Sequence, residues 1–221
     1  MATIFNAVIY QPILWVLVFL YQNIAFRDLG LAIILLTILV RIILLPLFYK
    51  GAKDQTILQR LQPHIRKIQL DHKDDREKQA KAMMELYKTN RINPFSGFFL
   101  LLLQLPIFIA LFEIFTQGIK SATFGGTYFL GLDLGAGSIL LAVLAALLQY
   151  FQGRLAMPAG KDMETTQKIM VFVGPLVTVL VLGNLPAALS LYWSVSNLFS
   201  LGQQFYINEK LAPLPDEPQK P

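Results

Sequence analysis

One arginine lies inside an apolar run that is long enough to cross a membrane. Residues 29–49 form this run, and Arg41 is its only charged residue. At 1.5 Å per residue, a straight helix of this length covers a hydrocarbon core of about 30 Å. A charge at the bilayer centre costs roughly 2.5 to 3.5 kcal/mol on insertion scales, so it usually faces a partner or a water-filled cavity. Arg41 is therefore the first candidate for function, and the alternative is that it snorkels to the cytosolic headgroups.

Other apolar runs carry hydroxyl and amide side chains at a comparable depth. Lipid cannot hydrogen-bond such groups, so together with Arg41 they predict a hydrophilic groove that is open to the cytosol. The outer halves of the runs are mainly apolar, which predicts that the groove is closed on the other side. The alternative is ordinary hydrogen bonding between helices, worth only about 0.6 kcal/mol per bond. Trp193 fits a packed aromatic as well as a groove residue. The predicted groove residues are Arg41, Thr37, Gln149, Gln152, Trp193, Ser194, Asn197 and Gln204.

The composition excludes an ordinary water-soluble domain. Hydrophobic residues make up 55% of the 221 residues, charged residues only 15%, and the mean hydropathy is +0.53. Soluble domains carry about 25% charged residues. The chain has no cysteine, which excludes disulfides, thiol catalysis and cysteine-ligated metals. No catalytic dyad or metal cluster is recognisable, so we expect neither an enzyme nor a cofactor. The basic pI near 9.4 is attributed to cytoplasmic loops rather than to nucleic acid as a ligand.

The apolar runs predict an all-α integral membrane protein with five transmembrane helices. Gly, Pro and Asn residues separate the runs. An N-terminal region, 1–28, precedes the five-helix core 29–206, and its residues 6–26 are interpreted as an interfacial amphipathic helix. A cleaved signal sequence and a sixth span are the alternatives for that stretch. The predicted spans are 29–49, 95–117, 138–154, 168–184 and 186–206.

The charge distribution predicts the orientation. Residues 50–93 hold eleven Lys and Arg against six Asp and Glu, whereas residues 118–137 hold only Lys120 and Asp133. Segment 50–93 is therefore expected in the cytosol, with the N-terminus outside and the C-terminus inside. Its apolar spacing predicts a helical hairpin. The short tail 207–221 is expected to be disordered. The hairpin residues predicted to contact partners are Arg60, Arg66, Lys67, Lys73 and Arg76.

Several strings in this order resemble the YidC family of membrane insertases, which includes the Oxa and Alb proteins of organelles. They are LLTILVRIILLPL around Arg41, Leu61-Gln62-Pro63, NRINPFSG from Asn90, LQLPIF from Leu103, and the last span 189–204. The resemblance covers residues 6–208. It implies that Arg41 is the groove arginine, that Gln149 or Gln152 is the third-span glutamine, and that Trp193 is the last-span aromatic. It also implies that the hairpin meets the nascent chain or its delivery partners.

The sequence departs from the family pattern in three places. Phe98-Phe99-Leu100 stands where the family has Cys-Leu-Pro. The large periplasmic domain of some bacterial members has no room in this chain, and the tail lacks the basic residues attributed to ribosome contact elsewhere.

The predicted function is a membrane protein insertase that works without nucleotide hydrolysis. Its expected partners are nascent membrane proteins and the lipid bilayer, and further candidates are the ribosome or a secretion channel. The expected location is a bacterial-type plasma (inner) membrane. The alternative function is a small-solute or ion transporter, which would also need polar residues at mid-membrane. Transporters often contain internal repeats, and no convincing repeat is present here.

Overall fold

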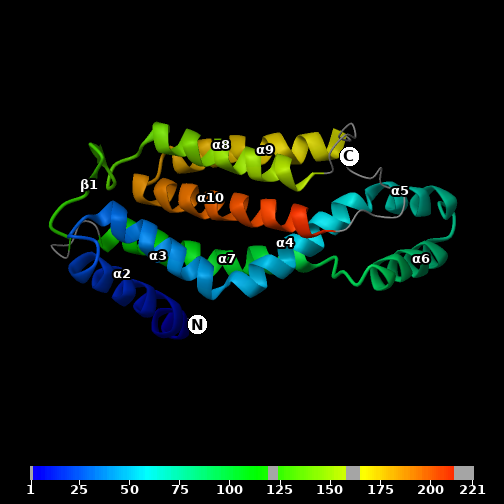
Figure 1. The fold of residues 1–221 in the computed structure, drawn as a ribbon, viewed down its shortest axis with the longest axis horizontal. Helices are drawn as coiled ribbons and strands as arrows, with labels where there is room; N and C mark the ends of the chain where they lie inside the picture. Colours follow the sequence, from blue (N-terminus) through cyan, green and yellow to red (C-terminus); the bar gives the residue numbers. More distant parts are fainter. Residues whose placement is uncertain (1, 119–123, 158–164, 212–221) are drawn as a thin grey trace.

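The computed structural model describes residues 2–118, 124–157 and 165–211, and helices dominate it (Figure 1). The predicted all-α class is confirmed. The described residues also contain one β-hairpin, whose two strands have two residues each. In chain order the elements are α1 (Ala2–Phe5), the π-helix η1 (Asn6–Tyr10), α2 (Gln11–Asn23), α3 (Leu29–Ile43), α4 (Leu45–Arg60), α5 (Gln62–Asp71), α6 (Arg76–Thr89), α7 (Ser96–Glu113), the π-helix η2 (Ile114–Gly118), β1 (Tyr128–Phe129), β2 (Leu132–Asp133), α8 (Ile139–Ala156), α9 (Thr165–Leu182) and α10 (Ala187–Lys210).

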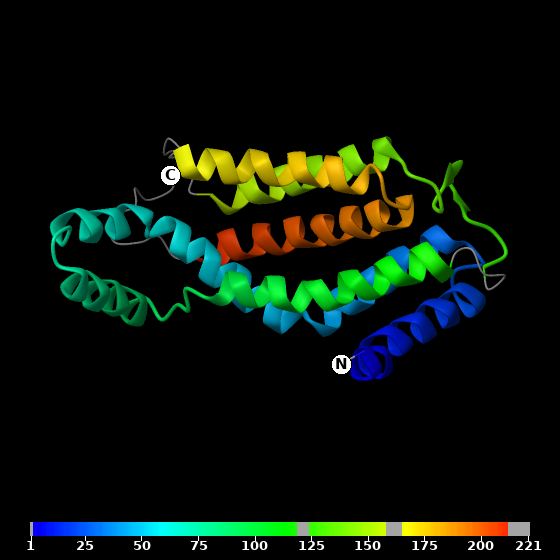
Figure 2. The ribbon, with the colours of Figure 1, turned by 180° about the vertical axis from the view of Figure 1, so that it is seen from behind.

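Helix α10 occupies the centre of an elongated bundle (Figures 1 and 2). It packs against α8 and α3, while α9 packs on α8 and α7 packs on α4. The strands β1 and β2 lie at one end of the bundle, here named the strand end. Helices α5 and α6 project from the opposite end, here named the hairpin end, where the last turn of α10 also lies. The expected tail 207–221 begins inside α10, which continues to Lys210, and residues 212–221 lie outside the described part.

Two of the described helices are long and apolar enough to cross a membrane by themselves. These are Ser96–Gln117 and Ile139–Ala156, and the pair α3 and α4 meets the same criteria only as one bent span. The segment Val171–Leu182 within α9 is a shorter apolar helix. Helix α10 is long enough, but its Ser, Asn and Gln residues lower its hydropathy. The number of five crossings therefore remains a prediction.

The run 29–49 was expected to be one straight helix, and this expectation is wrong. Helix α3 ends at Ile43, and α4 continues at an angle of 71°. The cause is Pro46, which has no amide hydrogen and whose ring clashes with the carbonyl four residues earlier in a continuous helix. Arg41 consequently lies in the last turn of α3, at the bend.

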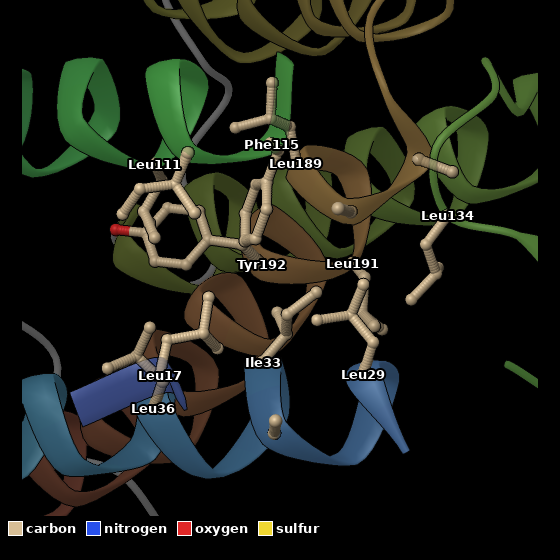
Figure 3. Close-up of a cluster of buried hydrophobic side chains, with 14 of the residues drawn as sticks. Leu17, Leu29, Ile33, Leu36, Leu111, Phe115, Leu134, Leu189, Leu191 and Tyr192 are labelled. Atoms are coloured by element: carbon tan, nitrogen blue, oxygen red, sulfur yellow. The ribbon is translucent and has the colours of Figure 1, made fainter. Parts of the chain in front are cut away.

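An apolar cluster fills the strand end and is named here the strand-end core. It joins side chains from α2, α3, the end of α7 with η2, α8 and the beginning of α10 (Figure 3). Tyr21 and Tyr192 are its two members with a hydroxyl group. Labelled members in Figure 3 are Leu17, Leu29, Ile33, Leu36, Leu111, Phe115, Leu134, Leu189, Leu191 and Tyr192.

The N-terminal segment is helical from Ala2 to Asn23 and lies obliquely beside α3 (Figure 2). Its Leu17, Leu20 and Tyr21 are buried in the strand-end core, whereas Trp15 is exposed on the opposite face. This packing does not distinguish between an interfacial helix, a cleaved signal sequence and a sixth span for residues 6–26.

The β-hairpin is fastened to the beginning of α3. Tyr128 pairs with Asp133 and Phe129 with Leu132 in an antiparallel register. The ring of Phe129 lies so close to Gly30 that a Cβ there would overlap it. Glycine at position 30 therefore permits the hairpin to close over the end of α3.

Helices α5 and α6 pack on each other through a small separate core of Leu61, Ile65 and Ile92. A buried carboxylate connects their base to the bundle. The Ser96 hydroxyl donates to Asp54 Oδ2 at 2.6 Å, and the backbone amide of Asn93 donates to the same oxygen at 3.5 Å. Asp54 thus holds the first turn of α7 against α4.

We expect Asp54→Ala to lower the free energy of unfolding by about 1.5 to 3 kcal/mol, because hydrogen bonds to a charged acceptor have this value and Ser96 would remain buried. Chemical unfolding in detergent micelles measures the change. Asp54→Asn retains an acceptor oxygen and should lose less. The exposed neighbour Lys53 provides the control, and an equal effect of Lys53→Ala would contradict the assignment.

Candidate functional site: a polar cavity around Arg41

The Arg41 side chain is buried against α10 and α4. Only 8% of the residue is exposed. Its Nε donates to Ser196 Oγ at 2.9 Å, and its Nη2 donates to the same oxygen. The guanidinium carbon lies 4.4 Å from the ring centroid of Phe48, which is a cation–π distance. No carboxylate within the described ranges forms an ion pair with Arg41. The positive charge is therefore held by a hydroxyl and an aromatic face, without neutralisation by an acid.

A partly open cavity of about 140 Å³ adjoins this guanidinium. Five of its nine lining side chains are uncharged polar groups, contributed by α4, α8 and α10. The lining residues are Arg41, Phe48, Ala52, Gln55, Leu100, Gln152, Ser200, Gln203 and Gln204. This volume is large enough for several water molecules, since one molecule occupies about 30 Å³ in the liquid.

The cavity and the strand-end core occupy different halves of the bundle. Arg41 lies in the last turn of α3, and the lining positions of α10 come in its second half, toward the hairpin end. Toward the strand end, the Tyr192 hydroxyl accepts a hydrogen bond from Gln104 of α7. Beyond Tyr192 the buried side chains of α10 are mainly apolar, namely Leu191, Leu189, Ala188 and Ala187. The polar surface therefore stops partway along the bundle.

Three of the predicted groove residues line the cavity: Arg41, Gln152 and Gln204. Gln204 is buried, and its Nε2 donates to Thr56 Oγ1 at 2.9 Å and to Asn208 Oδ1 at 3.0 Å. The sequence alone could not choose between Gln149 and Gln152, and the structure places Gln152 in the cavity wall.

Gln149 instead faces α9. Its Oε1 accepts from Thr178 Oγ1 at 2.5 Å and from Trp193 Nε1 at 3.4 Å. The Trp193 ring also packs edge-on against Phe108, with centroids 5.6 Å apart. Neither Gln149 nor Trp193 lines the cavity. Trp193 thus contacts Phe108 and Gln149, and its place in a groove stays a prediction.

The remaining predicted hydroxyl and amide residues satisfy backbone carbonyls. Thr37 donates to Ile33 O at 2.7 Å, and Ser194 donates to Ser190 O at 2.8 Å. Asn197 donates to Ala145 O at 3.2 Å and so connects α10 to α8. Of these three bonds, the Asn197 bond is of the interhelical kind that was the alternative to groove lining, whereas the Thr37 and Ser194 bonds lie within their own helices.

Sequence reasoning missed Ser196, which accepts hydrogen bonds from Arg41, and several residues of the cavity wall. Ser196, Ser200 and Gln203 follow one another at spacings of four and three, which places them on one helical face. The residues chosen on this helix from the sequence were Trp193, Ser194, Asn197 and Gln204, and of these four Gln204 alone lines the cavity. Phe48 and Gln55 could not be found, because they reach the cavity only through the bend after Ile43.

The basic residues predicted for partner contact lie away from this cavity. Arg66, Lys67, Lys73 and Arg76 are exposed on α5, on α6 and in the turn between them, and Arg60 is half-buried at the end of α4. They form a positively charged surface at the hairpin end.

Comparison with known proteins places this architecture in a family. Residues 19–213 match the family described as 60Kd inner membrane protein. The chain is 39% identical over 177 residues to the membrane protein insertase YidC of Clostridium tetani, covering 79% of each chain. It is 33% identical over 215 residues to the YidC of Pelobacter propionicus, covering 91% of this chain and 39% of that protein.

A solved structure has the same fold. It is described as an active YidC insertase crystal structure with the first transmembrane domain resolved, and it matches with a TM-score of 0.68 and 27% identity. The match covers 91% of this chain and 46% of that one. The resemblance drawn from the motifs is thereby confirmed, and so is the transmembrane character. The chain belongs to the YidC family of membrane insertases.

Proposed function

We propose that this protein is a membrane protein insertase whose clients enter through the cavity around Arg41. The observation that carries the proposal is a buried guanidinium that no carboxylate of the described residues neutralises, beside a cavity lined largely by polar residues. A short hydrophilic end of a client would enter the cavity before its apolar segment moves into lipid. Acidic residues or carbonyl oxygens of that end would be attracted to Arg41, because the charge is less screened there than in bulk water.

The proposed topology has five crossings, with the N-terminus outside and the C-terminus in the cytosol of a bacterial-type inner membrane. The cavity would then open toward the cytosol, since it lies on the same side of the strand-end core as the basic hairpin. The hairpin residues would meet nascent membrane proteins, and a ribosome or a secretion channel is a further candidate partner. Burial of the client's apolar helix in lipid supplies the driving force, so no nucleotide hydrolysis is required.

Reconstitution tests the proposed function. Purified protein in liposomes should raise the protease-protected fraction of a single-span client above that of empty liposomes, without added nucleotide. The same liposomes should show no specific flux of small solutes or ions. Insertion no better than in empty liposomes, or solute flux without insertion, would contradict the proposal and favour a transporter.

If water fills the cavity, loss of the Ser196 hydroxyl should have only a small effect on stability. We expect Ser196→Ala to lower the free energy of unfolding by only about 1 kcal/mol or less, because a water molecule can replace the hydroxyl as acceptor for Arg41. Ser200→Ala, on the same face and without a bond to Arg41, is the matched control. Unfolding titrations measure both variants. A loss near 3 kcal/mol for Ser196→Ala alone would indicate a dry site, in which the guanidinium is left unpaired.

A further inference from the structure

The turn between α2 and α3 places a phenylalanine at a left-handed position. The amide of Asp28 donates to Ala25 O at 2.7 Å and closes a tight turn between these two residues. The two central residues of the turn, Phe26 and Arg27, have φ values of 52° and 61°. Glycine or asparagine is strongly preferred at this left-handed position, since other side chains are strained there. The sequence therefore tolerates strain to keep an aromatic ring at this point.

The turn of the β-hairpin also contains a large apolar residue with a positive φ. Its central residues are Leu130, with φ 50°, and Gly131, with φ 82°. A two-residue turn with both φ values positive is the type I′ turn, for which Asn-Gly is the preferred sequence. Leucine occupies the position where asparagine would be least strained.

These two strained residues carry the most exposed large apolar side chains within the described ranges. Phe26 is 92% exposed and Leu130 is 86% exposed. Both lie at the strand end, because Phe129 packs on Gly30 and so places the hairpin turn near the beginning of α3 (Figure 1). Neither side chain contributes to the strand-end core. Strain and exposure at both sites indicate a contact outside the protein.

The surroundings identify lipid as that contact. The outward face of the N-terminal helix carries exposed Ile4, Val8 and Trp15, and this apolar surface continues along the chain to Phe26. Exposed Tyr128 and Arg27 accompany the two tips. Tyr, Trp and Arg side chains beside apolar groups are typical of the boundary between lipid and water, where the polar ends reach water. A transmembrane bundle has one such boundary at its strand end.

We propose that Phe26 and Leu130 insert into the lipid interface at the strand end and anchor the bundle at a defined depth. Their ring and isobutyl group reach the acyl boundary, while Arg27 and the Tyr128 hydroxyl stay among the headgroups. Lipid contact offsets the conformational strain of the two turns. The anchor does not depend on the insertase activity.

Single cysteines in the cysteine-free chain test the proposal. Phe26→Cys and Leu130→Cys each carry an environment-sensitive nitrobenzoxadiazole label in liposomes of phosphatidylethanolamine and phosphatidylglycerol. Nitroxide-bearing lipid should quench both labels more strongly than a water-soluble nitroxide. Gly126→Cys is the matched control at the same end, since an added Cβ there meets no atom within 4 Å, and its label should respond mainly to the water-soluble quencher. The proposal fails if all three labels respond alike.

In a second measurement, residues 26 and 130 are substituted and the label is placed at a different residue. Phe26→Asn and Leu130→Asn are combined, because asparagine suits both turns and keeps the fold. A label at Tyr128→Cys should then lose most of its quenching by nitroxide lipid relative to the parent chain, while a label at Gly126→Cys should not change. Unchanged lipid quenching at position 128 would show that the tips do not determine the depth.

Discussion

Arg41→Ala should lower the insertion rate of clients with acidic leading ends by at least about tenfold, while the protein remains folded. A single charge contact in a partly screened site is worth a few kcal/mol before desolvation, and 1.4 kcal/mol corresponds to a factor of ten. The fold should survive because no acid in the described part of the chain is paired with Arg41 and the side chain adjoins a cavity that is already open. The measurement is the rate of client protection in liposomes, for clients with acidic and with neutral leading ends.

Two variants show whether the charge or the side chain matters. Arg41→Lys retains the positive charge and should retain part of the rate, although it cannot reproduce both bonds of the guanidinium to Ser196. Arg154→Ala removes an exposed arginine from the last turn of α8 and should have little effect. If Arg41→Ala slowed acidic and neutral clients equally, or neither, the proposed attraction would be refuted.

Phe115→Ala should have the largest effect on stability, a loss of about 3 to 5 kcal/mol in the free energy of unfolding. This range is typical for truncation of a buried aromatic side chain, which loses its burial energy and leaves a cavity. Phe115 is 1% exposed and lies with Leu111 and Leu189 in the strand-end core (Figure 3). Chemical unfolding in mixed micelles, followed by circular dichroism, measures the change.

Phe112 supplies the matched control, one turn earlier on the same helical segment. It is 36% exposed, so Phe112→Ala should cost about 1 kcal/mol or less. If the strand-end core closes the cavity, Phe115→Ala should in addition make liposomes leak a small fluorescent dye, and Phe112→Ala should not. Equal losses of stability in the two variants would mean that the cluster is not a packed core.

The helical class and the membrane environment could be predicted because they depend on local composition. Hydropathy over some twenty residues reports the cost of leaving water, and no distant contact is needed to evaluate it. The excess of Lys and Arg in residues 50–93 similarly distinguishes that segment from the loop after α7. Arg41 could be singled out for the same reason, since a lone charge inside an apolar run is unusual wherever the chain folds.

The bend within 29–49 could not be predicted from hydropathy, which reports how apolar a segment is but not the direction in which its helix runs. Pro46 could have indicated a break. After the bend, α4 packs on α7, where Gly51 lets Leu100 approach closely. This bend brings Phe48 under the guanidinium of Arg41 and Gln55 into the cavity wall.

Sequence by itself determined which segments are apolar, which segment is basic and which charge is out of place, because these are sums over neighbouring residues. Only the tertiary structure decided which polar side chains meet. Gln149 and Gln152 are three residues apart on one helix, yet Gln149 bonds to Thr178 of α9 and Gln152 borders the cavity. Helical periodicity defines faces but not the neighbour of each face, and that neighbour depends on how α9 and α10 pack against α8.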